Sequence, residues 1–132
     1  MVDADSERCA AERRQLACEF KRLRAVFAAL GDETRQQIFL ALLEHDTVGM
    51  RVPELTERTH LSRPAVSHHL KVLRDARLVD RYRVGTMNFY YVDAAGPVWA
   101  EIKHLVDNAA LGSLSATSQG FPQMIEQKEL QL

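Results

Sequence analysis

The side chains best suited to binding a ligand are hydrogen-bond donors that gather between positions 58 and 83 of this 132-residue chain. This window holds seven Lys or Arg residues and two Asp residues, a net charge of +5, whereas the whole chain has a net charge of −1. Such donors bind the phosphates and base edges of nucleic acids. The candidates are Ser62, Arg63, Ser67, His68, Lys71, Arg81 and Arg83. The window predicts a surface for double-stranded DNA, with a solvated basic helix as the alternative.

A second candidate chemistry is that of the two cysteines, Cys9 and Cys18. Nine residues make two and a half turns of an α-helix, so on one helix the two thiols face opposite sides. A disulfide or a shared metal within one chain would then require the helix to break. Two hypotheses remain open: incidental thiols, or a metalloid or redox sensor that uses Cys9 and Cys18.

The histidines and acidic residues do not form a recognisable metal-binding pattern. His68 and His69 are adjacent, and neighbours on a helix diverge by about 100°, so they cannot chelate one ion together. Glu101 and His104 are one turn apart, but a solvated polar face is the expectation there. The sequence also lacks a Gly-rich phosphate loop and a Gly-x-Ser-x-Gly elbow. We therefore expect no metal, no cofactor and no enzymatic activity.

The elements before the basic window read as two helices. Between residues 12 and 30, apolar side chains recur in steps of four and three, the spacing of a narrow packing seam: Leu16, Phe20, Leu23, Phe27 and Leu30. Gly31 is expected to end this helix with a positive φ. Asp32 is the expected N-cap of a second helix. The buried face of that helix should comprise Ile38, Phe39, Leu42 and Leu43.

The basic window itself has the pattern of a helix-turn-helix. A short helix is expected over residues 53–59, anchored by Leu55, and Ser62 is the expected N-cap of a helix that reaches about Ala76. Residues 78–84 and 87–92 then favour a β-hairpin around Gly85. The fold class predicted is mainly α with a β-hairpin, a winged helix-turn-helix.

The helix after Ser62 has one apolar and one polar face. Val66, Leu70 and Leu73 share a side, while Ser67, His68 and Lys71 lie away from it. His69 is expected at the edge of the core. The polar face suits a DNA major groove. In the hairpin, Arg81 and Arg83 share one face and suit phosphates or a minor groove, with a charge-protected strand edge as the alternative.

The ends of the chain complete the predicted organisation. A last helix over about residues 95–109 carries a second seam made by Val98, Ile102, Leu105 and Ala109. Residues 1–112 are predicted to be a single domain, and 113–132 a flexible tail. No apolar run is long enough to span a membrane, and the acidic N-terminus has no secretory signal, so a cytoplasmic location is expected.

Two segments closely resemble the bacterial ArsR, or arsenic-repressor, family: Ala-Leu-Gly-Asp-Glu-Thr-Arg-Gln-Gln-Ile-Phe-Leu at residues 29–40, and the run Leu-Ser-x-Pro-x-Val-Ser-His-His-Leu that opens residues 61–79. The resemblance implies a homodimeric winged-helix repressor that leaves its operator when an effector binds. We expect the operator to be palindromic. The resemblance also implies that the first and last helices form the dimer interface, through Leu16, Phe20, Leu23, Phe27, Val98, Ile102, Leu105 and Ala109.

The sequence departs from the family pattern at two kinds of position. Arg77 stands where the family usually has glycine. The stretch 52–59 lacks the Cys-x-Cys typical of arsenic-sensing members, and His104-x-x-Asp107 matches only half of a zinc-sensing motif. The effector is therefore unassigned. A thiol sensor that uses Cys9 and Cys18, and a winged-helix protein-interaction module that does not bind DNA, are the alternatives.

Overall fold

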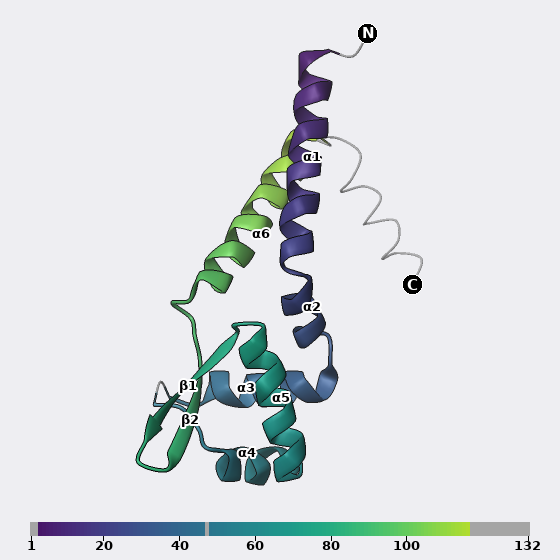
Figure 1. The fold of residues 1–132 in the computed structure, drawn as a ribbon. Helices are drawn as coiled ribbons and strands as arrows, with labels where there is room; N and C mark the ends of the chain where they lie inside the picture. Colours follow the sequence, from purple (N-terminus) through teal and green to yellow (C-terminus); the bar gives the residue numbers. More distant parts are fainter. Residues whose placement is uncertain (1–2, 47, 117–132) are drawn as a thin grey trace. The chain divides into compact units, whose positions relative to one another are not determined.

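A computed structural model describes residues 3–46 and 48–116, with side chains up to residue 110. In chain order the elements are α1 (Ala4–Arg22), α2 (Arg24–Leu30), α3 (Glu33–Glu44), α4 (Val52–Thr59), α5 (Arg63–Asp75), β1 (Val79–Val84), β2 (Met87–Val92) and α6 (Pro97–Ala116) (Figure 1). They form two compact units. Residues 23–101 make one, and α1 with the part of α6 from Ile102 onward makes the other.

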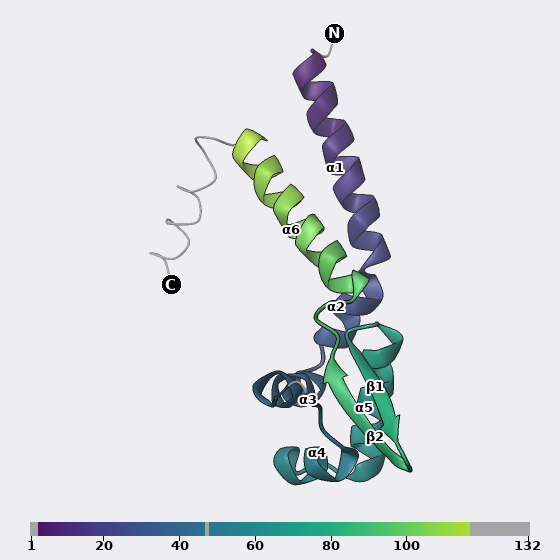
Figure 2. The same cartoon turned by 90° about the vertical axis from the view of Figure 1, so that its left-hand side faces the viewer.

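The unit of residues 23–101 has the arrangement of a winged helix-turn-helix. Helices α3, α4 and α5 pack together, and the β1–β2 hairpin lies against α5 and α3 (Figure 2). The largest fully buried side chains are Ile38, Leu55, Leu70, Leu73, Leu78 and Val66. The hairpin is antiparallel, with Arg81 opposite Tyr90, and Met50 forms an isolated bridge with Tyr90 on the other side of β2. β2 thus lies between β1 and Met50.

Local sequence signals account for the starts of α3 and α5. The Asp32 carboxylate accepts the backbone N–H of Arg35 at 2.8 Å and caps α3. The Ser62 hydroxyl accepts the N–H of Ala65 at 3.3 Å and caps α5. The helix-turn-helix turn passes through His60, whose φ of 60° is left-handed. The expected second helix, helix-turn-helix and hairpin are all present.

The first predicted helix differs from the structure. Instead of one helix over 12–30, α1 begins at Ala4 and ends at Arg22, and Leu23 interrupts the chain before α2 with φ −96° and ψ 8°. The regular spacing of apolar residues does not reveal this break, because Leu23 is buried although it lies between the two helices. Gly31 ends α2 as its C-cap, as predicted, but the positive φ expected for it was wrong, since its φ is −80°. Its N–H bonds to the Ala28 carbonyl, so the helix ends in a right-handed turn.

The prediction for α3 was correct except at one residue. Ile38, Phe39 and Leu42 are buried as expected, whereas Leu43 is 51% exposed. One residue rotates the helix by about 100°, so the neighbour of a buried residue can point to solvent.

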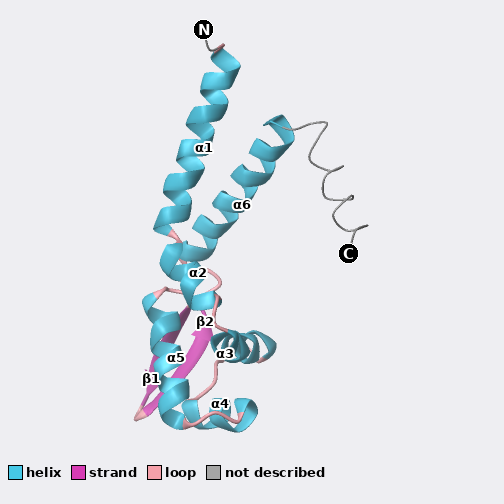
Figure 3. Cartoon of the chain, turned by 90° about the vertical axis from the view of Figure 1, so that its right-hand side faces the viewer, coloured by secondary structure: helices cyan, strands magenta, loops and turns pink. Residues whose placement is uncertain are grey.

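The second unit consists of α1 and the part of α6 from Ile102 onward (Figure 3). Among the described side chains of this unit Leu105 and Glu19 are buried, and the Glu19 carboxylate lies 3.3 Å from the His104 imidazole. Helix α6 continues past the predicted end of the domain at 112, as far as Ala116. The rest of the predicted tail, 117–132, lies outside the described residues. In the part of the chain that the structure describes, none of the helices is both long and apolar enough to cross a membrane.

Candidate nucleic-acid interface

Helix α5 has the two faces that its sequence predicts. Val66, Leu70 and Leu73 are fully buried and anchor the helix in the core. Ser67, His68 and Lys71 are exposed. Since the apolar side is held by the protein, the donor-bearing side is available to a partner, and a single α-helix fits a major groove.

The N-terminus of α5 adds donors of another kind. Ser62 and Arg63 are both exposed. Pro64 has no N–H and the Ala65 N–H bonds to the Ser62 hydroxyl, so the Arg63 N–H is the first-turn donor left at the helix end. This N–H and the helix dipole favour an anion such as a phosphate. The Ser62 hydroxyl uses its oxygen as an acceptor in the cap, so its proton is the part available to a phosphate oxygen.

The β1–β2 hairpin, the wing of the winged helix-turn-helix, carries the remaining basic donors. Arg81 and Arg83 are exposed on β1 and share the face that also holds Tyr90 and Asn88 of β2. Arg81 donates to the Tyr90 hydroxyl at 3.4 Å, and Arg83 Nε donates to the Gly85 carbonyl at 2.8 Å. Each contact uses only part of a guanidinium, which has five N–H donors, so both side chains keep donors for a ligand.

A contact that the sequence did not indicate joins α5 to the start of α3. Arg35 donates to the Ala29 carbonyl at 2.8 Å and lies 3.4 Å from Nδ1 of His69, which is half-buried as expected. Burial lowers the pKa of His69, and Asp32 partly offsets this. The backbone N–H of Arg35 lowers the pKa of Asp32. Burial therefore disfavours the protonated form of His69, whose Nδ1 faces Arg35, next to the exposed His68.

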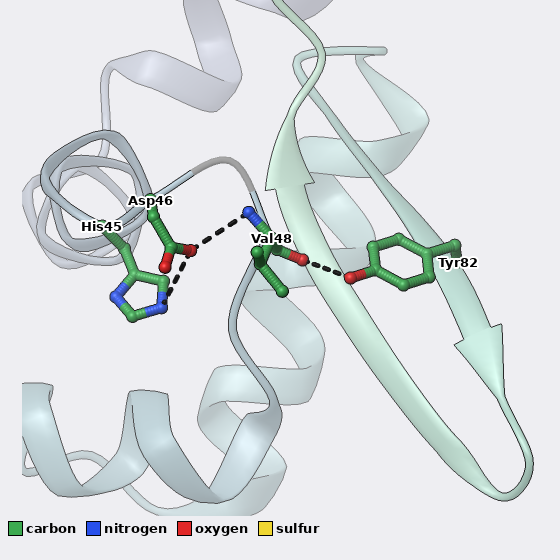
Figure 4. A network of polar contacts seen from close by, with 4 residues as sticks. All are labelled: His45, Asp46, Val48 and Tyr82. Atoms are coloured by element: carbon green, nitrogen blue, oxygen red, sulfur yellow. Dashed lines mark hydrogen bonds and ion pairs between the residues drawn. The ribbon is translucent and has the colours of Figure 1, made fainter.

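A second unforeseen contact involves Tyr82, which lies between Arg81 and Arg83 but points to the opposite face. Its ring stacks on Phe89, with 5.2 Å between the centroids, and its hydroxyl donates to the carbonyl of Val48 (Figure 4). Alternation along β1 predicts that Tyr82 lies on this face. Its partner is 34 positions away, and no local signal identifies it.

The two cysteines lie on α1, which is continuous between them. Cys9 is half-buried, Cys18 is exposed, and both are free. Their half-turn offset is therefore that of one helix, as expected. A sensor role for either thiol stays a prediction.

The residues of the partial zinc motif have protein partners. His104 Nε2 lies 3.3 Å from Glu19 and 3.0 Å from the Asn108 amide, and Asp107 pairs with Lys103 at 3.0 Å. Within residues 3–46 and 48–110, no three His, Cys, Asp or Glu side chains are grouped so as to hold a metal ion.

The residues predicted for the dimer interface do not share one environment. Leu23 and Val98 are buried in the unit of residues 23–101, and Leu105 is buried in the other unit. These three side chains are therefore used for packing within the chain. Phe20 and Ala109 are exposed, and Leu16, Phe27 and Ile102 are half-buried.

Comparisons with known proteins agree on one family. The model of the family described as bacterial regulatory protein, arsR family, matches residues 32–81. An uncharacterised HTH-type transcriptional regulator of Methanocaldococcus jannaschii is 34% identical over 74 residues, which are 56% of this chain and 81% of that protein. The transcriptional repressor SdpR of Bacillus subtilis is 34% identical over 65 residues, which are 49% of this chain and 69% of that protein.

A solved structure extends the similarity to the fold. The homodimeric winged helix-turn-helix DNA-binding domain of a possible ArsR-family regulator from Mycobacterium bovis superposes with a TM-score of 0.54 and 25% identity. The match covers 79% of this chain and 92% of that chain.

Proposed function

Because the chain belongs to the arsR family of bacterial regulatory proteins, we propose that it is a homodimeric transcriptional repressor that binds a palindromic operator. The observation that carries the proposal is the exposed donor face of α5 opposite a fully buried apolar face. Ser67 and His68 read base edges in the major groove. The groups that bind phosphates are Ser62, Arg63, Lys71, Arg81 and Arg83.

The dimer follows from how such helices meet DNA. In a dimer, each copy of α5 acts as a recognition helix. Two such helices about 34 Å apart reach successive major grooves on one side of the duplex, so a symmetric pair reads a palindrome. The similarity to a homodimeric domain supports this assembly. The proposed role is regulatory and not catalytic. A protein that binds the operator acts where the DNA is, so a cytoplasmic location is part of the proposal.

The direct test is selection of DNA by the full-length protein. Duplexes with a randomised core of about 30 base pairs cover two half-sites one turn apart. The selected sequences should contain inverted repeats with half-site centres about 10 base pairs apart. Gel shifts should then show tighter binding to the selected duplex than to a scrambled one. Failure to shift any duplex at low salt would favour the protein-interaction alternative.

The proposed repressor is released by an effector, and the exposed thiol of Cys18 makes thiol chemistry the first class to test. The gel shift is repeated with zinc, arsenite, peroxide and reductant. A reagent that releases the wild-type protein from DNA but does not release Cys9→Ser or Cys18→Ser identifies a thiol sensor. Release by zinc in both variants identifies a metal effector. A shift that resists all four reagents excludes both classes and points to an organic ligand or a protein.

A further inference from the structure

The orientation of the wing depends on contacts that join the hairpin to the rest of the domain. A two-stranded hairpin is only marginally stable on its own. Here β2 is held on one side by Met50, through two backbone hydrogen bonds of 2.8 Å with Tyr90. β1 lies on the other side of β2 and has no further strand beside it in the described residues. The strand that carries Arg81 and Arg83 is therefore the edge strand.

Tyr82 connects this edge strand to the opposite side of the hairpin. Its ring stacks on Phe89 of β2. The hydroxyl reaches beyond β2 to the Val48 carbonyl (Figure 4). The contact thus spans the sheet from β1 to the segment that bridges β2 from the other side. A side chain that spans three neighbouring segments limits both the twist and the tilt of the hairpin.

The acceptor end of this contact is also fixed. The N–H of Val48 donates to the Asp46 carboxylate at 3.0 Å, and the same carboxylate oxygen lies 3.4 Å from His45 Nε2 (Figure 4). His45 is the C-cap residue of α3, a helix that packs in the core. A chain of polar contacts therefore runs from the end of α3 to the middle of β1.

We propose that Tyr82 is a positioning residue for DNA binding: its hydroxyl, bonded to Val48, directs the wing so that Arg81 and Arg83 meet the phosphates. The inference rests on the proposed function. Tyr82 points away from the arginines, so it acts on DNA through the strand that it holds and not by contact.

The test uses Tyr82→Phe in the full-length protein, because this change removes the hydroxyl and keeps the stacked ring. The matched control is Tyr91→Phe, since Tyr91 lies on the same face with its ring 6.0 Å from that of Tyr82, and this change also removes a hydroxyl and keeps the ring. Binding to a selected duplex is measured over a series of salt concentrations. We expect Tyr82→Phe to raise Kd about three- to tenfold, the effect of one hydrogen bond, and to flatten the salt dependence. Tyr91→Phe should match wild type in both.

A double-mutant cycle separates positioning from general destabilisation. If Tyr82 acts through the arginines, Tyr82→Phe should have no effect in a protein that already carries Arg81→Ala and Arg83→Ala. An equal loss of affinity in both backgrounds would overturn the inference, as would an unchanged Kd and salt slope in the single variant. Absence of DNA binding by wild type would instead overturn the proposed function, so the two failures are distinguishable.

A variant of the acceptor segment supplies an independent arm. Asp46→Ala removes the acceptor of the Val48 N–H, whereas Asp46→Asn retains a side-chain oxygen. We expect the alanine variant to weaken DNA binding in the same direction as Tyr82→Phe, and the asparagine variant to bind like wild type. If both variants bind DNA as tightly as wild type, the proposed chain of contacts is contradicted.

Discussion

Arg77 holds a backbone conformation that most side chains avoid, with φ 62°. It lies just after α5, where the Leu78 N–H bonds to the Leu73 carbonyl at 3.0 Å and the Arg77 N–H bonds to the Arg74 carbonyl at 2.9 Å. This pair of bonds is a Schellman motif, and the buried Leu73 and Leu78 are its apolar contact. The motif fixes the turn between the recognition helix and the wing, so the strain at Arg77 is imposed by its surroundings.

Arg77→Gly should therefore stabilise the protein. A non-glycine residue in the left-handed region costs about 1 kcal/mol, and glycine lowers this cost, although it also gains freedom in the unfolded chain. Urea unfolding can be followed through Trp99, the single tryptophan, which stacks on Phe39. Arg77→Ala is the control, because it removes the charge and keeps the strain. Equal changes in the free energy of unfolding in both variants would contradict the explanation.

His69 makes the stability of the fold depend on pH. Burial lowers its pKa below the ordinary 6.5, with Arg35 and His68 acting in the same direction and Asp32 against it. The unfolded chain then binds a proton at a higher pH than the folded protein does. We expect the free energy of unfolding to fall as pH drops below about 6.5, until His69 itself is protonated.

The measurement is urea unfolding at several values between about pH 5.5 and 7.5, across the range where histidine titrates. His69→Gln should show a smaller pH dependence, because it retains an acceptor for Arg35 and does not titrate. His68→Gln, a change at the exposed neighbour, should keep the pH dependence of wild type. The same pH dependence in all three proteins would assign the effect to other groups.

At the scale of elements, α5 and the wing have different tasks in the proposed complex. Ser67 and His68 on α5 should provide discrimination, so Ser67→Ala and His68→Ala should lower the preference for the selected operator by about 1–3 kcal/mol. Arg81→Ala with Arg83→Ala should weaken binding to every sequence. This pair should also reduce the slope of log K against log salt by about 0.9 for each phosphate that the protein no longer binds.

Salt titrations on selected and scrambled duplexes measure both effects. Arg24→Ala is a matched control, because Arg24 is an exposed basic residue on α2, outside the proposed surface. The division of tasks is wrong if the α5 variants lose affinity equally for both duplexes, or if the arginine pair leaves the salt slope unchanged.

The elements also show what a single sequence predicts well. The caps at Asp32 and Ser62 and the hairpin at Gly85 are set by residues within a few positions of each other, so local patterns predict them. The interruption at Leu23 leaves no such pattern. The contacts of Arg35 with His69 and of Tyr82 with Val48 each join residues 34 positions apart. The surface donors could be predicted from the sequence, but the contacts that position them could not, because tertiary packing creates those contacts.

At the scale of the whole molecule, the described part of the unit of α1 and α6 exposes large apolar side chains. Phe20 is 52% exposed and Val106 is 57% exposed. Oε2 of the buried Glu19 has no hydrogen-bond partner among the described residues. Exposed aromatic and apolar side chains are typical of a protein interface. A second copy of the chain is the partner that the proposed palindrome requires.

Phe20→Glu should therefore weaken the dimer. Full burial of a phenylalanine contributes about 1.5–3 kcal/mol. Phe20 is 52% exposed and a symmetric interface contains it twice, so the dimer loses about 1.5–3 kcal/mol in total. That corresponds to roughly a ten- to hundredfold increase in the dissociation constant of the dimer, measurable by sedimentation equilibrium. Affinity for the palindromic operator should fall with it, because a monomer holds only one half-site, while affinity for a single half-site should not change. Ala11→Glu is the control, since Ala11 is exposed on α1 and lies on the opposite side of the helix from Phe20. A Phe20→Glu protein that remains as dimeric as Ala11→Glu would exclude this face of α1 from the interface, and the two recognition helices would then have to be paired through another surface.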